Sequence, residues 1–169
     1  MRCRFKLSEI KHWAGEYGDP AADAKAELVS RKARARGCLT RAELVTLAEW
    51  KSARIKHHAA ANDAAFVRDV TGLALSTSNE RLRIESLTLL RGVAWPMGSV
   101  ILHLCHTDGY PILDFRALWS LGEALPDRYD FPFWCRYVGT CRDLADRAGV
   151  DMRTLDRALW GYSKVNQRK

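Results

Sequence analysis

Apolar residues recur along most of the chain at intervals of three and four, the spacing that places side chains on one face of an α-helix. No stretch alternates apolar and polar residues as a half-buried strand would. We therefore expect an all-α fold, a helical bundle of about eight to ten helices without internal repeats. The predicted helices cover residues 8–17, 20–36, 41–58, 64–75, 78–91, 96–104, 115–121, 133–148 and 151–162.

Capping signals mark where several of these helices begin. Thr40 and Glu43 form a capping box, in which each side chain satisfies a backbone N–H of the other residue. The helix that follows should bury Leu44, Leu47, Ala48 and Ile55 on one face. Asn62 or Asp63 is placed to cap the next helix.

The stretch from Leu87 to Arg116 contains two apolar helical runs joined by Gly92-Val93-Ala94-Trp95. The first run should end at Arg91, because Gly92 accepts a positive φ at little cost. Pro96 suits the first turn of the second run, and Gly98 is small enough to let the first helix approach closely. The residues expected on the buried faces are Ile84, Leu87, Leu89, Leu90, Met97, Val100, Ile101 and Leu104.

This pair of helices resembles the helix-hairpin-helix of the DNA glycosylase superfamily that includes endonuclease III and the alkyladenine and 8-oxoguanine glycosylases. The family pattern, Leu-x-x-Leu-x-Gly-Val-Gly-x-x-x-Ala, is matched in spacing from residue 87 to 98, and the resemblance covers about residues 82–122. Ala94 replaces a family glycine, and Gly98 replaces an alanine. Asp114 lies 18 residues after Pro96, as the family's aspartate lies about 18 residues after its catalytic lysine. The matching residues are Leu87, Leu90, Gly92, Val93, Ala94 and Gly98.

The resemblance implies a monofunctional DNA glycosylase that hydrolyses the N-glycosidic bond of a damaged or modified base flipped out of double-stranded DNA. Asp114 would stabilise the positive charge that develops on the sugar and activate water. Pro96 stands at the lysine position and cannot form a Schiff base, so lyase activity is not expected. The residues expected to bind DNA are Arg91, Gly92, Val93, Ala94, Trp95, Gly98 and Arg116, and those expected to line the base pocket are Trp50, Lys51, Arg54 and Trp119.

Other interpretations of these residues remain open. Asp114 is also well placed to cap the helix that follows it, and Trp50 also fits a helical core. Residues 144–159 resemble a bacterial helix-turn-helix, with Arg153, Thr154 and Arg157 on the face that would enter a major groove. The alternative is therefore a DNA-binding regulator without chemistry.

Length and composition predict one globular domain, residues 1–169, in which the resemblance places the helix-hairpin-helix at about residues 82–107. The net charge of +7 and the pI near 9.4 favour an anionic partner. No run of 18 apolar residues is present and the first residues have no apolar core like that of a signal peptide, so we expect a cytoplasmic protein that does not enter membranes. A monomer is expected by default.

Metal and redox cofactors are not expected. The five cysteines include no CxxC pair, and Cys135 and Cys141 cannot supply the four ligands of the iron–sulfur cluster found in some members of the superfamily. His103 and His106 lie three residues apart but lack further obvious ligands. The resemblance leaves room only for an alkali ion at the hairpin.

Overall fold

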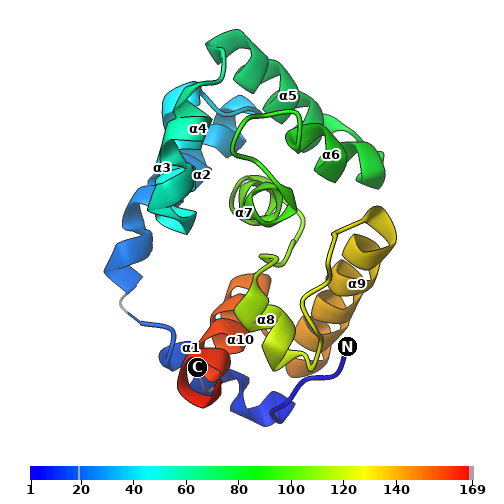
Figure 1. The fold of residues 1–169 in the computed structure, drawn as a ribbon. Coiled ribbons are helices and arrows are strands. Elements are labelled where there is room, and N and C mark those ends of the chain that lie inside the picture. Colours follow the sequence, from blue (N-terminus) through cyan, green and yellow to red (C-terminus); the bar gives the residue numbers. More distant parts are fainter. Residues whose placement is uncertain (19, 168–169) are drawn as a thin grey trace. The chain divides into compact units, whose positions relative to one another are not determined.

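The computed structural model describes residues 1–18 and 20–167, and within these residues the fold is built from ten α-helices and three short 3-10 helices, without strands. The predicted all-α class is confirmed. The chain forms two compact units, shown in Figure 1. Its two ends, Met1–Asp19 and Gly109–Lys169, build the terminal unit, and the middle, Pro20–Asp108, builds the central unit. A single domain over residues 1–169 remains a prediction.

The central unit is organised around one apolar helix. Helix α7 packs against α2, α3 and α6, and it is viewed close to end-on in Figure 1. All four residues predicted to face the core from this helix, Met97, Val100, Ile101 and Leu104, are buried. The elements of this unit are η2 (Pro20–Asp23), α2 (Ala24–Arg36), α3 (Arg41–Lys51), η3 (Ala53–Ile55), α4 (Lys56–Ala60), α5 (Ala64–Ser76), α6 (Glu80–Leu87) and α7 (Trp95–Cys105).

Helix α3 begins where the capping box predicts. The Thr40 hydroxyl accepts the N–H of Glu43 at 3.3 Å, and the Glu43 carboxylate accepts the N–H of Thr40 at 2.8 Å. The predicted continuous helix over residues 41–58 is wrong, because Ser52 takes an extended conformation with φ −167° and ψ 118°. The chain resumes as η3 and α4, so Arg54 does not lie on the same helix as Trp50.

Helix α6 ends earlier than predicted, at Leu87 instead of Arg91. The amides of Thr88, Leu89 and Leu90 each bond to the carbonyl three residues back, which tightens the chain from α-helical to 3-10 geometry. Leu87 and Leu90 are buried as predicted, but the prediction for Leu89 is wrong, since 63 % of it is exposed. The tighter winding changes the face on which each residue lies.

The terminal unit places α10 against α1, α8 and α9. Gly161 on α10 lies directly beneath α1, where a Cβ atom would be 2.2 Å from the Trp13 carbonyl oxygen. None of the described helices has the length and apolar content needed to cross a bilayer. The elements of this unit are η1 (Leu7–Glu9), α1 (Ile10–Gly15), α8 (Phe115–Ser120), α9 (Phe131–Ala148) and α10 (Met152–Asn166).

Candidate functional site

The residues predicted to act on DNA are divided between the two units. Asp114, Arg116 and Trp119 belong to the terminal unit. The central unit carries the other predicted site residues, namely Trp50, Lys51, Arg54, Arg91, Gly92, Val93, Ala94, Trp95 and Gly98.

The turn between α6 and α7, residues 88–94, rests against α4 of the same unit. Gly92 has φ +81°, as its predicted role as a helix stop requires. A Cβ atom at Gly92 would lie 3.0 Å from both the amide nitrogen of Ala59 and the Cβ of His58. This glycine is therefore required twice, once by its backbone conformation and once by the close approach of α4.

Asn62 fixes this turn in place, a role that its predicted use as a cap of α5 does not include. Its side-chain amide donates to the carbonyl oxygens of Ala59 at 3.0 Å and Arg91 at 2.9 Å, and its Oδ1 accepts the N–H of Arg91 at 2.8 Å. Asp63 caps α5 by accepting the N–H groups of Ala65 and Phe66. Asp63 therefore fills the capping position of α5, and the neighbouring, buried Asn62 is hydrogen-bonded to the turn instead.

Two amides of the turn have no hydrogen-bond partner within residues 1–18 and 20–167, those of Gly92 and Ala94. Helix α7 has no side-chain cap, because its N-cap residue is Ala94. Ala94 is exposed and Gly92 is half-buried, so this end of α7 presents backbone donors near the surface. Such an arrangement suits an anion.

The other residues of the predicted DNA-binding set differ in accessibility. Arg91 is exposed and Trp95 is half-buried. Val93 is buried, so only its backbone is suited to touch a ligand. Gly98 is buried where a Cβ would meet Ile84 Cδ1 at 3.1 Å, which confirms its predicted role in the close approach of α6 and α7 and does not support a DNA contact.

Asp114 caps α8, as one of the two interpretations of this residue predicted. Its Oδ1 accepts the N–H of Arg116 at 2.9 Å, and its own backbone is extended, with φ −146° and ψ 145°. The side chain is half-buried, and the two preceding residues, Ile112 and Leu113, are buried. A capping carboxylate keeps further lone pairs, so this role leaves room for chemistry.

Helix α9 holds the segment that leads to Asp114, residues 109–114. The Tyr137 hydroxyl donates to the carbonyl oxygen of Ile112 at 2.6 Å, and the Arg142 guanidinium donates to the carbonyl oxygen of Gly109 at 3.0 Å. Tyr110 stacks on Trp134, with their ring centroids 6.0 Å apart. Local sequence patterns do not reveal these partners, because they lie 24 to 33 residues away along the chain.

The negative charge of Asp114 contributes to a raised pKa at two tyrosines, Tyr129 and Tyr137. Burial raises the pKa of Tyr129, and the negative charge of Asp114 raises it further. Burial also raises the pKa of Tyr137 well above its usual range. Both phenols are therefore neutral hydrogen-bond donors at physiological pH.

Arg116 and Trp119 pack within the terminal unit. The Arg116 guanidinium lies over the ring of Trp160, 5.0 Å from its centroid. The Arg4 guanidinium lies over Trp119 at 4.6 Å, and Tyr162 stacks on the same indole at 5.7 Å. These contacts give both predicted site residues a packing role, and they do not support Trp119 as a wall of a base pocket.

Trp50 is anchored inside the central unit. Its indole N–H donates to the carboxylate of Asp23 at 3.1 Å, and Asp23 is only 2 % exposed. Trp50 and Lys51 are half-buried near the end of α3, whereas Arg54 is exposed on η3. Trp50 and Lys51 therefore lie on α3, whereas Arg54 lies on a separate element.

Residues 144–159, the predicted helix-turn-helix, lie at the end of α9 and the start of α10, with Gly149 at φ +61° between the two helices. Arg153 pairs with Asp156 at 2.7 Å, and its guanidinium lies over the ring of Tyr17 at 5.2 Å. The Arg157 guanidinium lies over the same ring at 5.7 Å. Two side chains that a recognition helix would extend into a groove are thus engaged by residue 17, just beyond the end of α1.

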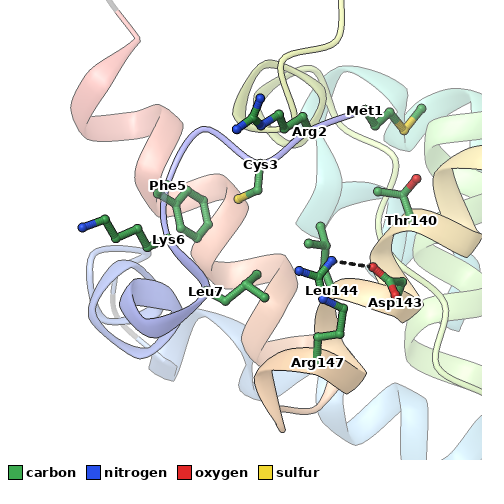
Figure 2. A pocket seen from close by; sticks show the side chains of 10 residues that line it. All are labelled: Met1, Arg2, Cys3, Phe5, Lys6, Leu7, Thr140, Asp143, Leu144 and Arg147. Carbon is green, nitrogen blue, oxygen red and sulfur yellow. Dashed lines mark hydrogen bonds and ion pairs between the residues drawn. The ribbon is translucent and has the colours of Figure 1, made fainter.

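A pocket of about 500 Å³ lies in the terminal unit between residues 1–7 and the C-terminal half of α9 (Figure 2). Phe5, Leu7 and Leu144 form its apolar part, and Arg147 pairs with Asp143 at 3.0 Å on its edge. Burial raises the pKa of the Cys3 thiol that lines it, so this cysteine is a weak nucleophile. Within the described part of the chain, no three His, Cys, Asp or Glu side chains gather as metal ligands would.

Comparisons with protein families, with curated proteins and with solved structures find no match to this chain.

Proposed function

We propose that this protein is a monofunctional DNA glycosylase that removes a damaged or modified base flipped out of double-stranded DNA. The observation that carries the proposal is the α6–α7 turn, a rigidly seated loop whose Gly92 and Ala94 amides have no partner among the described residues. Anionic oxygens of a DNA backbone are the ligands that such amides fit, whatever the base sequence.

The charge around the turn supports the same proposal. No Asp or Glu occurs between Glu85 and Asp108, so α7 and the turn carry no negative side chain. Arg91 is exposed within this stretch. Its cation would add a sequence-independent contact to a phosphate.

The proposed chemistry belongs to Asp114. As the bond between C1′ and the base nitrogen breaks, its electron pair leaves with the base and positive charge develops on the sugar. A carboxylate stabilises that charge and accepts a proton from the water whose oxygen then bonds to C1′. Pro96 offers no amine for a covalent intermediate, so the expected product is an intact strand with an abasic site. We expect a cytoplasmic monomer that needs no redox cofactor.

The alternative, a regulator that uses residues 144–159, receives less support. Arg153 and Arg157 lie against Tyr17, and Arg153 also pairs with Asp156. A recognition helix needs such side chains directed toward base edges. These contacts favour the glycosylase over the regulator.

The test is base release from a panel of duplexes that carry alkylated, deaminated, oxidised or enzymatically modified bases. Mass spectrometry identifies the free base, and alkali-labile breaks report the abasic site. Asp114→Asn should lower the rate on the order of a hundredfold or more, because the charge is lost. DNA affinity should remain within a few-fold, because asparagine caps α8 about as well as aspartate.

Asp151→Asn provides the matched control. Asp151 caps α10 by accepting the N–H of Thr154 at 2.6 Å, so this variant makes the same change at another helix of the same unit. It should keep full activity. Equal activity in the wild type and Asp114→Asn, or no base released from any duplex of the panel, would refute the proposed function.

A further inference from the structure

The segment that contains η3 and α4 carries positive charge without any acidic residue. No Asp or Glu occurs between Glu49 and Asp63, whereas Lys51, Arg54 and Lys56 occur there together with His57 and His58. Lys56 forms an ion pair with Glu49 at 2.8 Å. The other side chains of this segment have no acidic neighbour within the segment itself.

This segment is the one on which the α6–α7 turn rests. A Cβ at Gly92 would lie 3.3 Å from the carbonyl oxygen of Ile55, in η3, and 3.0 Å from the Cβ of His58, in α4. Asn62, two residues beyond α4, bonds to both the N–H and the carbonyl oxygen of Arg91. The turn and the η3–α4 segment therefore form one continuous piece of the central unit.

Three basic side chains of this piece are exposed on the η3–α4 segment. Arg54, His57 and His58 are all exposed, and Arg54 makes no ion pair with any described residue. The two imidazole rings lie with their centroids 3.8 Å apart. Each imidazole offers an N–H donor in its neutral as well as its charged form, and the guanidinium offers a fork of donors that matches phosphate oxygens.

We propose that Arg54, His57 and His58 form a second contact with the DNA backbone, next to the contact made by the α6–α7 turn. The ligand is the phosphodiester backbone, and the contact is independent of base sequence. The inference rests on the proposed function in so far as the turn binds DNA. It goes further by giving His57 and His58 a role that the resemblance did not give them, and by assigning Arg54 to the DNA backbone instead of the predicted base pocket.

The experiment measures the affinity of an unmodified duplex by fluorescence anisotropy over a range of salt concentrations. Arg54→Ala should weaken binding and reduce the slope of log K against log salt by about one, because one phosphate contact releases about one counterion. His57→Ala combined with His58→Ala should weaken binding several-fold for every duplex sequence tested. His58→Ala keeps the Cβ atom that packs against Gly92, so the seat of the turn is preserved.

Arg68→Ala is the matched control, because Arg68 is an exposed arginine on α5 of the same unit. It should leave the affinity and the salt slope unchanged. Thermal unfolding of each variant checks that the fold is retained, and the exposure of all the replaced residues predicts small changes.

The possible outcomes separate this inference from the proposed function. If the Arg54 and histidine variants bind like the wild type while Asn62→Ala loses affinity, the second contact is refuted and the turn is supported. If Arg68→Ala weakens binding as much as Arg54→Ala, the effect is one of overall charge and the inference fails. If the wild type does not bind duplex DNA at all, both the inference and the proposed function fail.

Discussion

The α6–α7 turn and the segment before α8 are both irregular stretches, yet the protein holds them in different ways. The turn depends on one buried side chain, Asn62, and on the close approach of Gly92 to α4. The segment at residues 109–114 has three independent contacts with α9, namely two hydrogen bonds and a ring stack. A single substitution can therefore release the turn, whereas residues 109–114 keep two of their three contacts with α9 when any one is removed.

The difference also concerns where each support lies along the chain. Asn62, two residues beyond α4, is hydrogen-bonded to Arg91 across 29 residues. Among the described residues, no other side chain of residues 56–63 is hydrogen-bonded to the turn. The two hydrogen bonds and the ring stack that support the Asp114 segment come from α9, one long helix whose apolar face is buried by its own packing. Residues 109–114 are therefore held against a helix that is itself part of the core of the terminal unit, and their position does not depend on any one polar group.

Gly92→Ala should break the turn with the largest effect on stability. The alanine must adopt φ +81°, and its Cβ would lie 3.0 Å from both the Ala59 amide nitrogen and the His58 Cβ of α4. The left-handed conformation costs about 1–2 kcal/mol, and the crowding adds about 1–3 kcal/mol. Chemical denaturation should show a loss of about 2–5 kcal/mol in the free energy of unfolding of the central unit, accompanied by weaker DNA binding.

Gly37→Ala separates strain from crowding. Gly37 ends α2 in the same unit with φ +79°, but a Cβ there would meet nothing within 4 Å. This variant should therefore lose only the conformational part, about 1–2 kcal/mol, and should bind DNA like the wild type. Equal losses in both variants would show that α4 does not press against the turn.

Features that depend on neighbouring residues were predictable from the sequence. The capping box at Thr40 and Glu43 and the positive φ of Gly92 follow from local chemistry, and the structure confirms both. The buried face of α7 follows from its spacing, because a helix surrounded by others must be apolar. These features fix the all-α fold.

Features that depend on tertiary contacts were not predictable in this way. The break at Ser52 interrupts a periodic pattern that would suit a longer helix, and Leu89 turns outward because the last turn of α6 tightens. The role of Asn62 depends on a carbonyl 29 residues away, which no local pattern reveals. Sequence spacing therefore indicated the position of the turn but not what holds it.

Asn62→Ala should have the next largest effect. Removing its amide leaves the N–H and carbonyl oxygen of Arg91 without their partner, at a cost of about 2–3 kcal/mol. Hydrogen exchange should become faster at the Arg91 amide, and DNA affinity should fall. Asn79→Ala is the control, because Asn79 caps α6 through the Leu82 N–H and has no bond to the turn. It should cost about 1 kcal/mol without changing exchange at Arg91.

Tyr137→Phe tests the other side of the comparison and should have the smallest effect. The variant loses the 2.6 Å hydrogen bond to the Ile112 carbonyl oxygen, which costs about 1–2 kcal/mol of stability because that acceptor is buried. Arg142 and the Tyr110–Trp134 stack still hold the segment, so base release should change less than about threefold, equivalent to well under 1 kcal/mol. Tyr162→Phe, which loses only a 3.4 Å contact with Arg4, is the matched control and should be nearly neutral. A drop in activity as large as that of Asp114→Asn would show that Tyr137 alone positions the carboxylate, and the contrast between the two stretches would be wrong.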